Sequence, residues 1–388
     1  MLIAPDFIHI YERRAFMRRL HHNPRPNWPA LVESQGMFYH TADDVPYWDE
    51  SVSYEFTRRE IDELEAATYE LNDRCLEAVD FVIEQDRLSE VGIPLMYHDY
   101  IRESWERDDR TIYGRFDFHY DGTLPPRLLE YNADTPTGLV EAAVVQWHWR
   151  GDCRPQADQF NCLHERLIEA WKELLDPAKK LYFVTGEEHL EDYMNVNYLR
   201  DTAIQAGWST EYLDIDKMCW DSHRKRFLDQ KHQSIECCFK LYPWEWMFSE
   251  PFGQNLLAAP TRWLEAPWKA VLSNKAILVI LSEMFPGHPN LLQASYEPLP
   301  GDYVMKPVHS REGANVRLIH SGRVLEDRDG PYDGPVIYQE MALLPDFDGF
   351  HPCIGSWLVN GWASGLGIRE DSSWITGNLS RFVPHAFL

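Results

Sequence analysis

The sequence has no run of apolar residues near the ~20 that a membrane-spanning helix needs, so no transmembrane helix is predicted. Its opening residues, MLIAPDFIHIYERRAF, place the positive charges after a short apolar run, which is the wrong order for a secretory signal. None of the seven cysteines forms a CxxC pair, which argues against a zinc cage and a disulfide framework. We therefore expect a reduced, cytoplasmic protein.

Positive charge is also scarce, because the sequence has 37 Lys and Arg residues against 62 Asp and Glu residues, which gives a formal net charge of −25. So acidic a protein repels nucleic acid and anionic membranes, and we expect neither as a partner. Any bound phosphate has to be held by a few local cations. The sequence also lacks G-x₄-GK[ST], GxSxG and HExxH motifs, which argues against a Walker-type nucleotide site, a serine hydrolase and a zinc peptidase.

The local patterns predict a mixed α/β (or α+β) protein whose 388 residues divide into two or three lobes. Thr57 and Glu60 form a capping-box pattern at the start of an apolar-periodic helix over residues 58–84. Residues 180–216 alternate strand, helix and strand, which predicts a βαβ unit with parallel strands. A helix is expected over residues 136–149, with Thr135 as its cap.

A predicted hairpin carries the most informative polar residues. Its strands, GRFDFHY and RLLEYN, are joined through the turn signal Asp121-Gly122. Because strand residues two apart share a face, Asp117, Glu130 and Asn132 converge if the aromatic residues between them face the core. Such oxygen ligands suit Mg²⁺, particularly when phosphate completes the coordination. The alternative is a solvated polar face with ordinary cross-strand pairs.

Two neighbouring features suit anionic groups. Arg115 lies on the same hairpin face, and its planar guanidinium can grip phosphoryl or carboxylate oxygens. The expected helix start at Thr135–Thr137 offers free backbone N–H groups to a substrate carboxylate.

Further cations and loops could hold a triphosphate. Lys306 ends a predicted strand, and the polar loop after it, which holds Ser310, Arg311 and Gly313, could close over phosphates. Other candidates for ATP contacts are Lys275, Gln339, Glu340, Met341 and Arg369. Each of these residues could instead have a purely structural role. A lone lysine is more often structural, residues 339–341 could simply form a strand, and Arg369 could be an exposed arginine in a turn.

Several motifs together resemble a known family. The segments GRFDF, LLEYNADTPTG, KPVHSREGANV, IYQEMALLPDFDG and GIREDSSWITGNLSRFVPH are similar to the synthetase part of glutathionylspermidine synthase and to shorter bacterial acid–amine ligases. The similarity runs over nearly the whole chain in the same motif order. It implies a circularly permuted ATP-grasp fold with a βαβ pre-ATP-grasp-like lobe. Because it does not include the amidase domain of the synthase, amidase activity is not expected.

The resemblance also assigns roles to residues. It implies that Asp117, Glu130 and Asn132 bind two Mg²⁺ and that Arg115 contacts ATP and stabilises the transition state. By this resemblance Lys275, Lys306, Gln339, Glu340 and Arg369 would contact ATP or its phosphates. Arg311, Gly313 and Met341 join the ATP-binding candidates from the loop and strand patterns alone. Thr135, where the synthase has serine, and Thr137 would face the acid substrate. The acidic pair Glu187–Glu188 falls where the synthase has substrate-binding acids, within a weaker match.

The resulting expectation is an ATP- and Mg-dependent carbon–nitrogen ligase acting on a small acid and an amine. An ATP-dependent phosphotransferase and a non-catalytic nucleotide-binding protein are the alternatives. We divide the chain into an N-terminal helical region with the metal-binding hairpin (1–179), a βαβ substrate lobe (180–265), a nucleotide-binding lobe with a phosphate lid loop (266–345) and a β-rich return to the ligase core (346–388).

Overall fold

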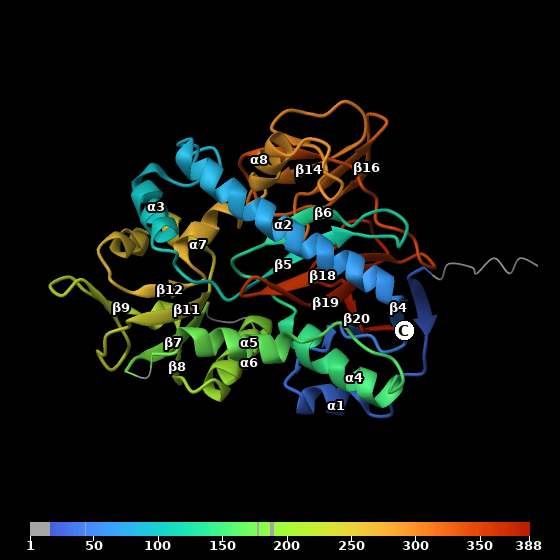
Figure 1. The fold of residues 1–388 in the computed structure, drawn as a ribbon, viewed down its shortest axis with the longest axis horizontal. Helices are drawn as coiled ribbons and strands as arrows, with labels where there is room; N and C mark the ends of the chain where they lie inside the picture. Colours follow the sequence, from blue (N-terminus) through green and yellow to red (C-terminus); the bar gives the residue numbers. More distant parts are fainter. Residues whose placement is uncertain (1–15, 43, 177, 187–189) are drawn as a thin grey trace, which may run out of the picture.

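The computed structural model describes residues 16–42, 44–176, 178–186 and 190–388. These residues form three larger sheets with helices packed around them (Figure 1). The mixed α/β class expected from the sequence is confirmed. No helix in this part of the chain is long and apolar enough to cross a bilayer.

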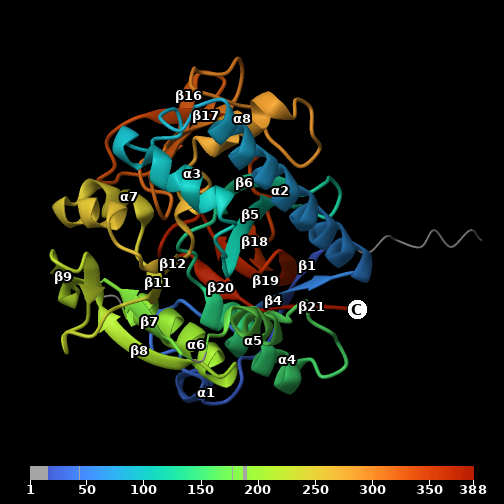
Figure 2. The same cartoon turned by 60° about the vertical axis from the view of Figure 1, so that its left-hand side comes forward.

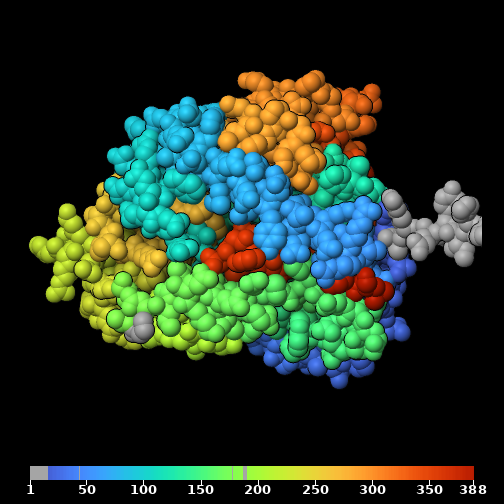
Figure 3. Space-filling view, in the orientation of Figure 1, coloured from blue at the N-terminus to red at the C-terminus, as the bar shows by residue number. Residues whose placement is uncertain are grey.

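The central sheet is antiparallel and joins distant parts of the chain. Its five strands follow the order β20-β19-β18-β5-β6. They are β5 (Tyr113–His119), β6 (Arg127–Asn132), β18 (His351–Val359), β19 (Trp362–Asp371) and β20 (Arg381–Val383). The predicted hairpin β5–β6 therefore extends a sheet made by the last forty residues. In the space-filling view, C-terminal atoms (red) are visible between N-terminal segments (blue) and the green helices (Figure 3).

One long helix, α2 (Arg58–Glu84), covers this sheet on the side facing the viewer in Figure 1. It begins and ends where the sequence predicts, and the Thr57–Glu60 capping box is present. Its buried stripe includes Ile61, Leu64 and Leu71, which join the larger hydrophobic core. Burial of this stripe, more than helix propensity, holds the helix in place.

The second sheet is parallel and contains the predicted βαβ unit. Its order is β12-β11-β7-β8, formed by β7 (Lys180–Thr185), β8 (Ser209–Asp214), β11 (Cys237–Leu241) and β12 (Arg262–Leu264). Helix α6 (Leu190–Gln205) connects β7 to β8 and packs beside α5 (Leu163–Leu174), as Figure 2 shows from another side.

The third sheet carries the candidate phosphate-binding residues. Its order is β13-β17-β14-β15-β16, formed by β13 (Ala294–Ser295), β14 (Tyr303–Pro307), β15 (Arg317–His320), β16 (Arg323–Asp327) and β17 (Val336–Glu340). Helix α8 (Ile277–Met284) packs against α2 and β13. The remaining elements are β1 (Arg18–His21), α1 (Trp28–Ser34), β2 (Thr41–Ala42), β3 (Val45–Pro46), β4 (Val52–Phe56), α3 (His98–Glu106), α4 (Gln146–Cys153), β9 (Cys219–Asp221), β10 (Arg226–Leu228), α7 (Trp244–Ser249) and β21 (His385–Phe387).

The helix expected over residues 136–149 is wrong at its start. Residues 135–138 have no regular secondary structure, helical structure begins at Leu139, and a π-helical turn (Glu141–Val145) leads into α4. The Tyr113 hydroxyl donates a hydrogen bond to the Pro136 carbonyl, and Arg115 donates one to the Thr137 carbonyl. Gly138 adopts a φ of +82°, which is outside the right-handed helical region. The helix therefore starts only after Gly138. The expected anion site on helix-start amides is therefore absent at Thr135–Thr137. The Leu139 N–H already donates to Asn195.

The capping box yields a stability prediction. Thr57→Ala removes the hydroxyl that accepts from the Glu60 N–H, and should lower the free energy of unfolding by about 1 kcal/mol. Urea unfolding followed by circular dichroism measures this. The control Asp62→Ala removes only an exposed ion pair with Arg58, and should change stability by less than about 0.5 kcal/mol. Equal effects of the two variants would refute the assigned cap.

Candidate active site

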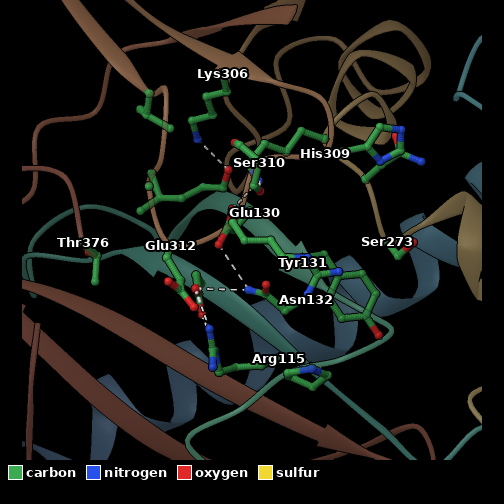
Figure 4. A pocket seen from close by; sticks show the side chains of 18 of the residues that line it. Arg115, Glu130, Tyr131, Asn132, Ser273, Lys306, His309, Ser310, Glu312 and Thr376 are labelled. Atoms are coloured by element: carbon green, nitrogen blue, oxygen red, sulfur yellow. Dashed lines mark hydrogen bonds and ion pairs between the residues drawn. The ribbon is translucent and has the colours of Figure 1, made fainter. Parts of the chain in front are cut away.

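A cavity of about 520 Å³ lies where the three larger sheets meet. The hairpin, residues 133–137, the loop after β14 and the end of β19 all contribute to its wall. Figure 4 shows the hairpin residues Arg115, Glu130 and Asn132 on one side and Lys306 on the other. The volume suits a substrate of drug-like size.

Asp117 lies at the centre of a hydrogen-bond cluster. Arg115 donates to both of its oxygens, at 2.6 and 3.0 Å, and Arg369 donates to Oδ2 at 2.7 Å. Asn132 Nδ2 donates to the same Oδ2 at 3.2 Å. The expectation that these side chains share a face is confirmed. It follows from the β5–β6 register, which pairs Asp117 with Glu130 and Arg115 with Asn132.

Glu130 completes this cluster on the neighbouring strand. Its Oε2 lies 3.1 Å from Lys275 Nζ, and its Oε1 accepts from Asn132 Nδ2 at 3.3 Å. Burial alone would raise the pKa of Glu130, but the nearby charges of Lys275, Lys306 and Arg369 outweigh burial and hold this pKa well below its usual range. Glu130 is therefore ionised at neutral pH.

The donor set fits Mg²⁺ bound together with phosphate. Two carboxylates and one carboxamide supply oxygens, and among the described residues no three His, Cys, Asp or Glu side chains gather around a single point. Mg²⁺ commonly takes one or two protein carboxylates and fills its octahedron with phosphate and water. Asn132 now points its Nδ2 at both carboxylates, so its amide has to turn over before Oδ1 can face a cation.

Lys306 approaches the cluster from β14. Its ammonium donates to the Leu129 carbonyl at 2.9 Å and to Gln339 Oε1 at 2.6 Å. Burial lowers the pKa of Lys306 to about 8, with a further lowering from the charge of Lys275, although Glu130 opposes the shift. Lys306 is therefore mostly protonated at neutral pH and loses its proton as the pH rises above about 8.

Of the other residues predicted to contact ATP, only some line the cavity. Gln339 is buried behind Lys306 and does not line the cavity, and Glu340 is exposed beside Arg127. Met341 does line the cavity, within an apolar wall that also includes Val304 and Leu318. The pair Glu187–Glu188 lies outside the described residues.

The loop after β14 closes one side of the cavity. Arg311 donates to Thr135 Oγ1 at 2.9 Å and to Glu245 at 2.8 Å, and its guanidinium lies over the Trp246 ring. Gly313 has a φ of +70°, and a Cβ there would lie 2.6 Å from the carbonyl oxygen of Thr376. Glycine is thus required at this contact between two loops.

Sequence reasoning missed several residues of this wall. Asp134, Glu191, Tyr242, Glu245 and Trp246 line the cavity without having been singled out. Glu191 faces Thr137, and burial raises the pKa of its carboxyl group. One signal was available: the strand CCFKLY carries one charged residue, Lys240, in an otherwise apolar run, and Lys240 pairs with Asp134.

Comparison with known proteins gives consistent results. A family model described as glutathionylspermidine synthase preATP-grasp matches residues 19–388. A Haemophilus influenzae protein named "Putative acid–amine ligase" is 39% identical over 384 residues, covering 94% of this chain and 98% of that protein.

Two larger relatives match over part of their length. The trypanothione synthetase of Crithidia fasciculata is 30% identical and covers 81% of this chain, and the bifunctional glutathionylspermidine synthetase/amidase of Escherichia coli is 28% identical and covers 85%. The chain spans 53% and 58% of these two proteins.

A solved structure shows the fold alone. A glutathione synthetase-like effector of Globodera pallida, in its apo form, superposes with a TM-score of 0.54 at 12% identity, covering 94% of this chain and 99% of that one. The ATP-grasp-type fold expected from the sequence is therefore confirmed. Since the family model spans nearly the whole described chain, this protein belongs to the glutathionylspermidine synthase family of ATP-dependent acid–amine ligases.

Proposed function

We propose that this enzyme activates a carboxylic acid with ATP as an acylphosphate and transfers the acyl group to an amine, releasing ADP and phosphate. The observation that carries the proposal is the cluster around Asp117 and Glu130, in which two carboxylates face four cations inside one cavity: Arg115, Lys275, Lys306 and Arg369. In a protein with a net charge of −25, this local excess of positive charge suits a polyphosphate.

In the first step, a carboxylate oxygen of the acid attacks the γ-phosphorus of ATP, the bond from this phosphorus to the β-phosphate oxygen breaks, and ADP leaves. During this transfer, charge spreads over the phosphoryl oxygens. Lys275, Lys306 and Arg369 would offset this charge, and Met341 with the apolar wall would receive the adenine. Mg²⁺ held by Asp117, Glu130 and Asn132 would neutralise phosphate charge and orient the transfer. The loop from Ser310 to Asn315 would exclude water from the acylphosphate.

In the second step, the amine nitrogen attacks the acyl carbon. The carbon–nitrogen bond forms, the bond from carbon to the phosphate oxygen breaks, and phosphate leaves. Arg115, held in place by Asp117 and the Thr137 carbonyl, would stabilise the tetrahedral oxyanion. The nitrogen also loses a proton, and Glu191 is a suitable acceptor because burial raises its pKa.

The substrates belong to the same proposal. The names of the relatives support a peptide acid such as glutathione and a polyamine such as spermidine, with Thr135 and Thr137 facing the acid. The acidic surface would attract a polyamine, and a cytoplasmic location would supply both substrates and ATP.

The first prediction concerns the products. With Mg-ATP, a panel of small acids and peptides crossed with a panel of amines should release ADP only when both substrates are present. Mass spectrometry should then detect the amide. ADP formation with a phosphorylated acceptor and no amide would favour a phosphotransferase. Absence of ADP release and of nucleotide binding would favour a non-catalytic protein.

The second prediction concerns the metal ligands. Asp117→Asn and Glu130→Gln should each lower Mg-dependent ADP release at least ~100-fold, because each removes a charged ligand while keeping the side-chain shape. Circular dichroism should show the wild-type fold. The exposed variant Asp62→Asn serves as control and should turn over normally. Near-normal activity in both site variants would discard the metal assignment.

The third prediction concerns pH. Lys306 has a pKa of about 8 in the free protein, and bound phosphates favour its charged form. ATP binding near pH 8 should therefore take up protons, and ATP affinity should fall as pH rises above 8, where charging Lys306 becomes costly. Titration calorimetry in buffers of different ionisation enthalpy measures the uptake. Lys306→Arg should abolish it, because arginine stays charged. Uptake that persists in this variant would assign it to another group.

A further inference from the structure

Residues 134–137, here called the acid-side segment, link the metal-binding hairpin to the π-helical turn and line the cavity. Thr135 accepts a hydrogen bond from Arg311, and the Thr137 carbonyl accepts one from Arg115 at 2.6 Å. The segment belongs to no helix or strand, so its position depends on the contacts that hold it.

A buried ion pair anchors this segment to the parallel sheet. Lys240, on β11, donates to Asp134 Oδ1 at 2.6 Å, and the Trp244 N–H at the start of α7 donates to Oδ2 at 2.9 Å. The side chains of Lys240 and Asp134 are 0% and 1% exposed. Lys240 also donates to the Tyr242 carbonyl and lies 4.3 Å from the centre of the Trp244 ring.

The pair joins the sheet of the β5–β6 hairpin to the parallel sheet. Asp134 follows the end of β6, whereas Lys240 and Trp244 belong to the parallel sheet and the helix after it. Both carboxylate oxygens are used, so Asp134 can neither turn nor shift without leaving a buried charge unpaired. Because breaking a buried ion pair strongly destabilises a folded protein, the pair favours one position of the neighbouring residues Thr135 and Thr137.

We propose that Asp134 and Lys240 are a positioning pair that fixes the acid-side segment, and thereby sets the affinity for the acid substrate and leaves that for ATP unchanged. The proposal rests on the proposed function, because it assigns the acid to the side of Thr135 and Thr137. Neither residue touches the reacting atoms. Their effect passes along the backbone to Thr135 and Thr137, the two residues assigned to the acid.

The test uses a double variant that removes both charges. Asp134→Asn/Lys240→Met keeps an acceptor for the Trp244 N–H and leaves no buried charge unpaired, and replacement of both partners of such a pair is often tolerated. The matched control is Arg25→Met/Glu50→Gln, a second ion pair with side chains 7% and 0% exposed whose two residues do not line the cavity.

Two readouts separate positioning from general damage. Hydrogen exchange followed by mass spectrometry reports on peptides that span residues 134–138. Steady-state ADP release, with spermidine and varied glutathione as the first substrate pair, gives KM for the acid and for ATP separately. For the Asp134/Lys240 variant we expect at least tenfold faster exchange in that peptide. We also expect at least a tenfold higher KM for the acid, with KM for ATP within twofold of wild type.

The outcomes are distinct. The control variant should match wild type in both readouts. Unchanged exchange in the Asp134/Lys240 variant, or equal rises in KM for acid and ATP, would overturn the proposal. If the wild-type enzyme makes no amide with any acid–amine pair, the proposed function fails. The exchange measurement then still decides whether the pair fixes the segment.

Discussion

The pairing of Asp117 with Glu130 across two antiparallel strands is the constraint on which the site depends. It places two carboxylates on one face. Arg115 comes from the same strand as Asp117, and the other cations come from elsewhere: Arg369 from β19, Lys275 from the residues before α8, and Lys306 from β14. Asp117 is therefore balanced by one local and one distant arginine, and Glu130 by a lysine that only the fold brings near. This arrangement holds a concentrated charge cluster in a protein whose overall charge repels phosphate.

The position of β5 explains how such a cluster is kept rigid. This strand lies between β18 and β6 and is buried along its whole length, with Phe116 stacked on Tyr131 on the core face. Its polar residues consequently emerge from a fixed backbone. The loop from Ser310 to Asn315 and the acid-side segment have no regular secondary structure. The loop is held by Arg311, and the segment is held by the Asp134–Lys240 pair.

Much of this was predictable from local pattern. The capped helix α2, the hairpin and the βαβ unit each have signals contained within fewer than forty residues, and the convergence of Asp117, Glu130 and Asn132 follows from strand alternation. The pairing of β5 with β18 has no local signal, because its partner lies more than two hundred residues away. The predicted helix start at Thr135 was wrong because carbonyls in that segment accept hydrogen bonds from Tyr113 and Arg115. Helix propensity does not reflect such tertiary contacts. Nothing in the sequence indicated that the side-chain amide of Gln339, a predicted ATP contact, accepts a hydrogen bond from Lys306.

The most direct test of the charge cluster is a crystal structure with Mn²⁺, a non-hydrolysable ATP analogue and anomalous scattering data. The account predicts metal density between the carboxylates of Asp117 and Glu130, Asn132 Oδ1 turned toward the metal, and the β- and γ-phosphates within reach of Lys275 and Lys306. Metal bound away from Asp117 and Glu130, or nucleotide bound outside this cavity, would contradict it.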